Sequence, residues 1–168
     1  MAELAQQERL QPALLDRLTD DAPDKSRESR ERRALNMRQL RASVLRDLAW
    51  LLNTDNLDAS QSLEDFPLVA SSVLNFGIPD LAGLTSSSVD VGELERSLQH
   101  AISIFEPRIL ADSLSVTVSV AGEQMDHNAM TLEIDGELWA KPLPLHLFLK
   151  TEVDLESGAI RVVESSGG

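Results

Sequence analysis

Apolar side chains recur at three- and four-residue steps in two stretches of the chain, which is the spacing of a helix with one buried face. The first stretch covers residues 34–53. Its apolar positions are Leu40, Val44, Leu48 and Leu51 or Leu52. The second stretch runs from Asp90 to Phe105, and Asp90 and Glu93 have the spacing of a capping box. Its apolar positions are Leu94, Leu98, Ala101, Ile102 and Phe105. We therefore predict two amphipathic helices.

Two shorter helices are indicated by prolines, because proline is tolerated at the first position of a helix. One follows Pro12 and covers residues 13–18. The other begins near Pro67 and continues to Leu74, where Asn75 and Gly77 end it.

From Leu114 onward, apolar and polar residues alternate, as they do in a strand with one buried face. The alternating segments are 114–120, 130–135, 143–155 and, after a turn at Ser157 and Gly158, 159–164. Alternation with polar outer positions predicts an antiparallel sheet that is covered on one side. The expected fold is α+β: N-terminal helices followed by an antiparallel sheet of about four strands packed against them.

The charged and apolar-poor segment 20–33 predicts a mobile linker. We therefore expect three parts: a short helix and linker in residues 1–33, one α+β domain in residues 34–164, and a disordered tail in residues 165–168. A chain of 168 residues with 42% hydrophobic residues is large enough for one well-packed domain.

The net charge of −13 lies in one part of the chain. Residues 1–56 hold ten acidic and ten basic residues, whereas residues 57–168 hold eighteen acidic and five basic ones. An acidic body repels anionic polymers such as nucleic acid and peptidoglycan, so basic protein surfaces are the better candidates for partners. The arginines that could contact nucleic acid are Arg27, Arg30, Arg32, Arg33, Arg38 and Arg41. A solvated, partly disordered helix start is the favoured interpretation of this cluster, because Glu28 and Glu31 are interleaved with it.

Cofactor and metal motifs are missing from the sequence. There is no cysteine, and His100, His127 and His146 lack the spacing of metal ligands. Glycine-rich phosphate loops and serine-nucleophile motifs are also absent, so no cofactor is expected. The N-terminus is polar, and no apolar run approaches the ~18 residues of a membrane span. We expect a soluble, cytoplasmic protein.

Glu106, Pro107 and Arg108 stand where the helical pattern ends. Proline disfavours the helical conformation of the residue before it, so Glu106 is expected in extended geometry, with its carboxylate on the same side as Arg108. Two interpretations remain open. The pair is either an exposed, exchangeable salt bridge at the start of a strand, or a rigid carboxylate–guanidinium unit that contacts another chain.

An enzymatic interpretation would use Glu106 as a general acid beside a second carboxylate such as Asp112. Arg108 argues against it, because an adjacent guanidinium favours the ionised carboxylate. A general acid needs its pKa raised.

Four segments resemble a known family: LLDRL at 14–18, LRASVLRDLAWLLNT at 40–54, SVLNFG at 72–77 and EPRI at 106–109. They are similar to the type VI secretion baseplate subunit TssE, which is itself similar to the wedge protein of contractile phage tail baseplates, a family sometimes labelled lysozyme-like. The match spans residues 12–164.

The resemblance implies a non-catalytic subunit of a six-fold baseplate, docked at the inner face of the inner membrane. Its implied partners are the wedge subunits TssF, TssG and TssK and the sheath proteins TssB and TssC. The resemblance also implies an assembly contact at Glu106, Pro107 and Arg108. If they contact a partner, Arg108→Ala should leave the isolated fold largely intact. The alternative is a peptidoglycan hydrolase that uses Glu106.

Two further contacts follow from the resemblance. Leu14, Leu15 and Leu18 would dock on a wedge subunit, although packing onto the protein's own helices is equally compatible with the pattern. A sheet edge would accept strands from the sheath, and the candidates are 143–155 and 159–164. Pro142 and Pro144 would limit uncontrolled pairing at one end of that edge.

Overall fold

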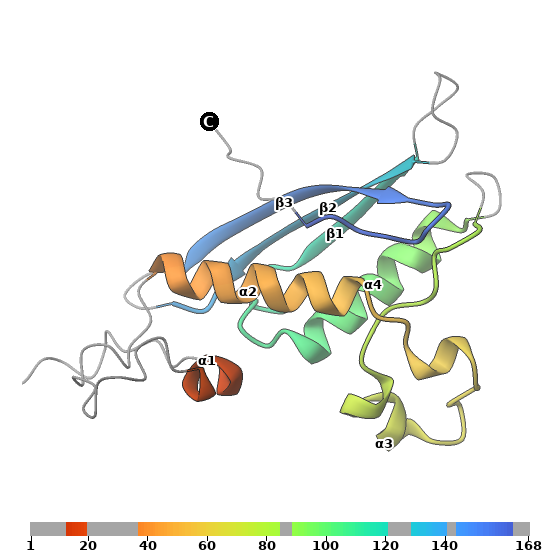
Figure 1. The fold of residues 1–168 in the computed structure, drawn as a ribbon, viewed down its shortest axis with the longest axis horizontal. Helices are drawn as coiled ribbons and strands as arrows, with labels where there is room; N and C mark the ends of the chain where they lie inside the picture. Colours follow the sequence, from red (N-terminus) through yellow and green to blue (C-terminus); the bar gives the residue numbers. More distant parts are fainter. Residues whose placement is uncertain (1–12, 20–36, 85–88, 121–128, 141–143, 163–168) are drawn as a thin grey trace, which may run out of the picture.

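Two helices lie against one face of a three-stranded antiparallel sheet in the computed structural model (Figure 1). The structure describes residues 13–19, 37–84, 89–120, 129–140 and 144–162. The predicted linker 20–33, the tail 165–168, Pro142 and His127 lie outside these residues. The helices precede the strands along the chain, which confirms the predicted α+β class.

The covering helices are α2 (Met37–Leu52) and α4 (Val91–Phe105), both within the predicted ranges. Their buried apolar residues are Leu40, Val44, Leu48, Leu51, Leu52, Leu94, Leu98, Ala101 and Ile102, as the periodicity predicts. The Asp90 carboxylate accepts a hydrogen bond from the Glu93 amide at 2.9 Å, which starts α4 as its spacing predicts. The short helix α1 (Leu14–Leu18) is also confirmed and lies beside α2 (Figure 1).

The single helix predicted at 67–74 is wrong. Two separate turns form instead, α3 (Pro67–Ala70) and the 3-10 helix η4 (Val73–Asn75), and a further 3-10 helix, η3 (Leu57–Ala59), precedes them. Ser72 between the two turns is extended, and its hydroxyl both donates to the Val69 carbonyl and accepts from the Leu74 amide. Serine side chains that bond nearby backbone groups compete with helical hydrogen bonds, which explains the break.

The strands β1 (Ser115–Val120), β2 (Ala129–Leu138) and β3 (Leu145–Asp154) pair in the order β1-β2-β3. Buried and exposed side chains alternate along β1 and β3, as predicted.

The fourth strand predicted at 159–164 is reduced, within the described residues, to one bridge between Ile160 and Val153. The Asn53 side chain bonds both backbone groups of Ile160, and the Thr151 hydroxyl bonds the Arg161 carbonyl. These side chains therefore form hydrogen bonds with backbone groups that would otherwise pair with a neighbouring strand.

Candidate functional site

A tight turn carries Glu106, Pro107 and Arg108 away from the end of α4. Glu106 leaves the helix at φ −124° and ψ 69°, outside the helical region that proline disfavours in the residue before it. The Ile109 amide then bonds the Glu106 carbonyl at 3.1 Å, so residues 106–109 form a turn with proline at its second position. The predicted extended geometry is wrong here, although the exit from the helix is confirmed.

Glu106 and Arg108 form an ion pair in which both carboxylate oxygens are used. Oε1 accepts from Arg108 Nε at 2.6 Å and from the Arg108 amide at 3.2 Å, and Oε2 accepts from the same guanidinium. Only 2% of Glu106 is exposed. The predicted pairing is therefore confirmed, but the carboxylate is buried inside the subunit.

The guanidinium of Arg108 also reaches α2. It donates to Asp47 Oδ2 at 2.5 Å and to Ser43 Oγ at 2.7 Å. Burial of Arg108 acts to lower its pKa, but hydrogen bonds and attraction from Glu106 and Asp47 outweigh burial and raise the pKa above its ordinary value. Arg108 thus joins the turn to the middle of α2 as a permanent cation.

Ser43 connects this pair to α1. Its hydroxyl, on a residue only 4% exposed, donates to Asp16 Oδ2 at 2.7 Å and accepts from Arg108 and, at 3.3 Å, from Arg46. One donor and two acceptor sites are all that a hydroxyl offers, so Ser43 is saturated. Arg46 also bonds Asp16 Oδ1 at 2.6 Å and Asp47 Oδ1 at 2.9 Å.

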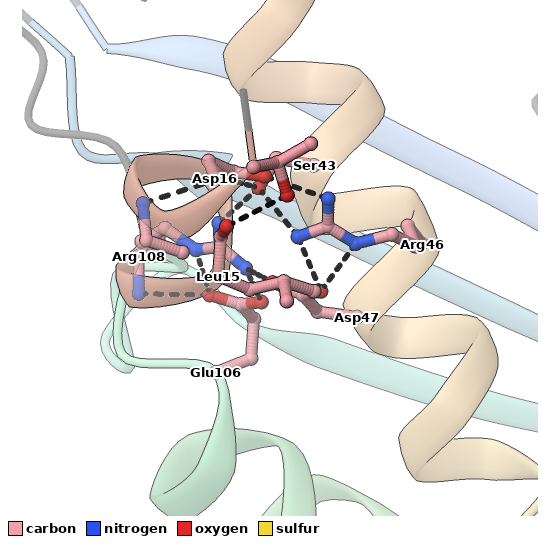
Figure 2. A network of polar contacts seen from close by, with 9 residues as sticks. Leu15, Asp16, Ser43, Arg46, Asp47, Glu106 and Arg108 are labelled. Atoms are coloured by element: carbon pink, nitrogen blue, oxygen red, sulfur yellow. Dashed lines mark hydrogen bonds and ion pairs between the residues drawn. The ribbon is translucent and has the colours of Figure 1, made fainter. Parts of the chain in front are cut away.

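We call Asp16, Ser43, Arg46, Asp47, Glu106 and Arg108 the polar cluster (Figure 2). It contains three carboxylates and two guanidiniums, contributed by α1, α2 and the turn after α4. Burial acts to raise the pKa of Asp16, but hydrogen bonds from Arg46 and Ser43 outweigh it and hold that pKa below its ordinary value. The cluster ties three segments of the chain together.

The leucines of α1 are exposed to solvent. Leu14, Leu15 and Leu18 are 70%, 42% and 73% exposed, and α1 is held by Asp16. The Asp16 carboxylate also bonds the Ala13 amide at the start of the helix. The structure therefore brings Glu106 and Arg108 together, leaves Pro107 exposed between them, and leaves the α1 leucines open to solvent.

Sequence reasoning missed the roles of Asp16, Ser43, Arg46 and Asp47. Residues 43, 46 and 47 stand three and four apart and therefore share one face of α2. A small polar residue on the border of the apolar face, followed by an arginine and an aspartate at that spacing, was the available signal.

The geometry does not favour acid–base chemistry at Glu106. Its two oxygens are engaged by Arg108, its carboxylate is buried, and Asp112 is exposed outside the cluster. Among the described residues, no group of histidine, aspartate and glutamate side chains is arranged to hold a metal ion. His146 lies on the outer face of the sheet, where its Nε2 is 2.9 Å from Asp135 Oδ1. What the cluster offers is rigidity.

In a comparison with protein families, the family described as baseplate wedge protein gp25 matches residues 38–143. The chain belongs to the baseplate wedge gp25 family. The matched residues include α2 from its second residue, the turn at 106–109 and β2, and exclude α1 and β3. No curated protein and no solved structure matches the chain. Membership assigns a structural role in a phage-tail-like baseplate. No helix in the described ranges is long and apolar enough to cross a bilayer.

The gp25-family sheet has two different edges. Along β1, the Val118 amide bonds Glu95 Oε1 at 2.8 Å and the Leu114 carbonyl, just before the strand, accepts from Gln99 at 2.9 Å. Side chains of α4 therefore cover backbone groups of this edge. Along β3, the Asp154 amide bonds Ala159, which covers the end of the strand.

Proposed function

We propose that the protein is the TssE-like subunit of a type VI secretion baseplate, a non-catalytic component that joins wedge subunits to the first ring of the contractile sheath. Membership of the gp25 family and the four resembling segments support this proposal. The expected partners are TssF, TssG and TssK in the wedge and TssB and TssC in the sheath. The subunit would work in the cytoplasm, at the inner face of the inner membrane.

The sheath contact is inferred from the backbone groups along the first half of β3, which point away from β2. Backbone groups of an antiparallel strand point alternately towards its two neighbours. Asp154 bonds Ala159 on the side away from β2, so His146, Phe148 and Lys150 direct their backbone groups to that same side. Within the described part of the chain, no strand pairs there. A strand from a sheath subunit would extend the sheet by main-chain hydrogen bonds.

In this proposal Glu106 and Arg108 do not contact a partner directly, because the polar cluster engages both side chains. Glu106 is buried and Arg108 is mostly covered, whereas Pro107 is exposed. We infer that the triplet supports assembly by holding the exposed turn and α1 in one arrangement. Leu14, Leu15 and Leu18 would then present an apolar surface to a wedge subunit.

The test of the sheath contact is Phe148→Pro. Proline lacks the outward N–H of residue 148 but leaves the groups that pair with β2, so binding of purified TssB–TssC should be lost. Phe148→Ala is the matched control, since it removes the aromatic ring and keeps the N–H. Co-purification of TssF, TssG and TssK should be unchanged in both variants. Equal sheath binding by the proline variant would refute strand addition at this edge.

A further inference from the structure

Residues 57–76, here called the helical lobe, expose four large apolar side chains. The lobe contains η3, α3 and η4 and lies below the α2–α4 layer in Figure 1. Phe66 is 53% exposed, Leu68 86%, Val73 81% and Leu74 69%. They lie on α3 and η4, which are in contact with each other, or on the residue that precedes α3. Neighbouring apolar side chains at this exposure indicate a contact surface.

The lobe is held in shape by polar groups that point inward. Asn75 accepts from the Asp58 amide at 3.0 Å and donates to the Ala70 carbonyl at 3.0 Å, which joins its first and last turns. The Asp58 carboxylate bonds the Leu63 amide at 2.9 Å, and Asn56 caps η3. Asn56, Asp58 and Asn75 therefore direct their polar groups into the lobe, while Phe66, Leu68, Val73 and Leu74 face solvent.

The base of the lobe is closed by backbone pairing. The Asn56 amide bonds the Ile78 carbonyl at 2.9 Å, and the Ile78 amide bonds the Thr54 carbonyl at 2.8 Å. Gly77 makes this approach possible at φ +132°, where an added Cβ would lie 2.3 Å from the Thr54 oxygen. The exposed side chains are thus presented by a pinned segment, which lowers the conformational cost of binding.

Charge identifies the chemistry of the partner. Residues 47–95 contain nine acidic and no basic or histidine residues. Glu64 and Asp65 are exposed and directly precede Phe66. These acidic residues would repel an anionic lipid surface or a nucleic acid, and two copies of the lobe would repel each other. A partner with an apolar ridge flanked by lysine or arginine would complement both the exposed apolar side chains and the acidic residues beside them.

We propose that the helical lobe is a second docking surface for a wedge partner, which contributes an apolar ridge bordered by basic side chains. This inference rests on the proposed function and adds a surface distinct from the β3 edge and from α1. The leucines and valine would supply the buried centre of the contact, with Glu64 and Asp65 at its charged rim.

The experiment measures binding of the full chain to a purified, co-expressed TssF–TssG–TssK complex by biolayer interferometry. Leu68→Ser combined with Leu74→Ser should weaken binding about tenfold or more. Glu64→Lys combined with Asp65→Lys should weaken it several-fold and reduce its dependence on salt. Met37→Ser removes an exposed apolar side chain at the far end of α2 and should bind as the parent does. All these side chains are exposed, so circular dichroism should be unchanged.

The outcomes separate this inference from the function on which it rests. If the parent protein fails to bind the complex, the proposed function is wrong and the docking surface falls with it. If the parent binds and the serine variant binds equally well, the docking surface is wrong and the function stands. Stronger binding by the lysine variant would refute the basic partner. Dimerisation of the parent that the serine variant abolishes would assign the lobe to a second copy instead.

Discussion

Arg108→Ala should destabilise the isolated protein strongly. The substitution removes the guanidinium that bonds both oxygens of Glu106, together with Asp47 and Ser43. Glu106 is 2% exposed and, among the contacts of the described residues, keeps only the 3.2 Å bond from the residue 108 amide. Removing one partner of a buried ion pair costs about 3–5 kcal/mol, because the other charge stays desolvated. Against a total stability of about 5–15 kcal/mol, that is a large loss.

The free energy of unfolding can be measured by urea denaturation, followed by the fluorescence of Trp50 and Trp139. Arg96→Ala is the control, since this exposed arginine bonds only the Gly92 carbonyl of its own helix among the contacts described. That change should stay within about 0.5 kcal/mol. The double variant Glu106→Met/Arg108→Met should be more stable than Arg108→Ala, because no carboxylate then remains buried without its guanidinium.

A loss below about 1 kcal/mol for Arg108→Ala would refute this reasoning, since exposed salt bridges contribute that little. It would restore the expectation from sequence that the substitution spares the fold and removes only a partner contact. If Arg108→Ala loses the predicted stability, its failure to support sheath assembly in cells could result from unfolding. That failure alone would not show that Arg108 contacts a partner. The assay in cells would need the double methionine variant beside it.

Three further outcomes follow from the described contacts. The folded pKa of Asp16 lies below its ordinary value of 3.8, so the contribution of Asp16 to holding α1 is present above pH 3.8 and is lost as the pH falls through the folded pKa. The amide resonances of α1 in NMR spectra should therefore shift over this pH range. Asp16→Asn should abolish that shift. Gly77→Ala should cost more than about 1 kcal/mol in urea denaturation, since its Cβ meets the Thr54 carbonyl at a positive φ, whereas Gly83→Ala, with open space around it, should cost less. Leu98→Ala should cost about 2–5 kcal/mol at a site only 1% exposed, and a smaller change would contradict its place in the core.

The spacing of apolar residues was sufficient to predict α2, α4 and the sheet, because each depends on a periodicity carried by neighbouring residues. It was insufficient at residues 67–74, where Ser72 bonds local backbone groups and interrupts the helix. It was also insufficient at 159–164, where the Asn53 side chain bonds Ile160 from 107 residues away. The first failure came from local chemistry that the pattern ignores, and the second from a contact between distant segments.

The sequence by itself determined the helices and strands, the faces they bury, and the change of direction that Pro107 imposes on Glu106. Only the tertiary structure decided where the Glu106–Arg108 pair points. Arg108 meets Ser43 and Asp47 across 65 and 61 residues of chain, and Asp16 joins them from α1. The physical reason is that periodicity sets which side of each element is apolar, whereas the partner of a polar group on the border of that side depends on how the elements pack.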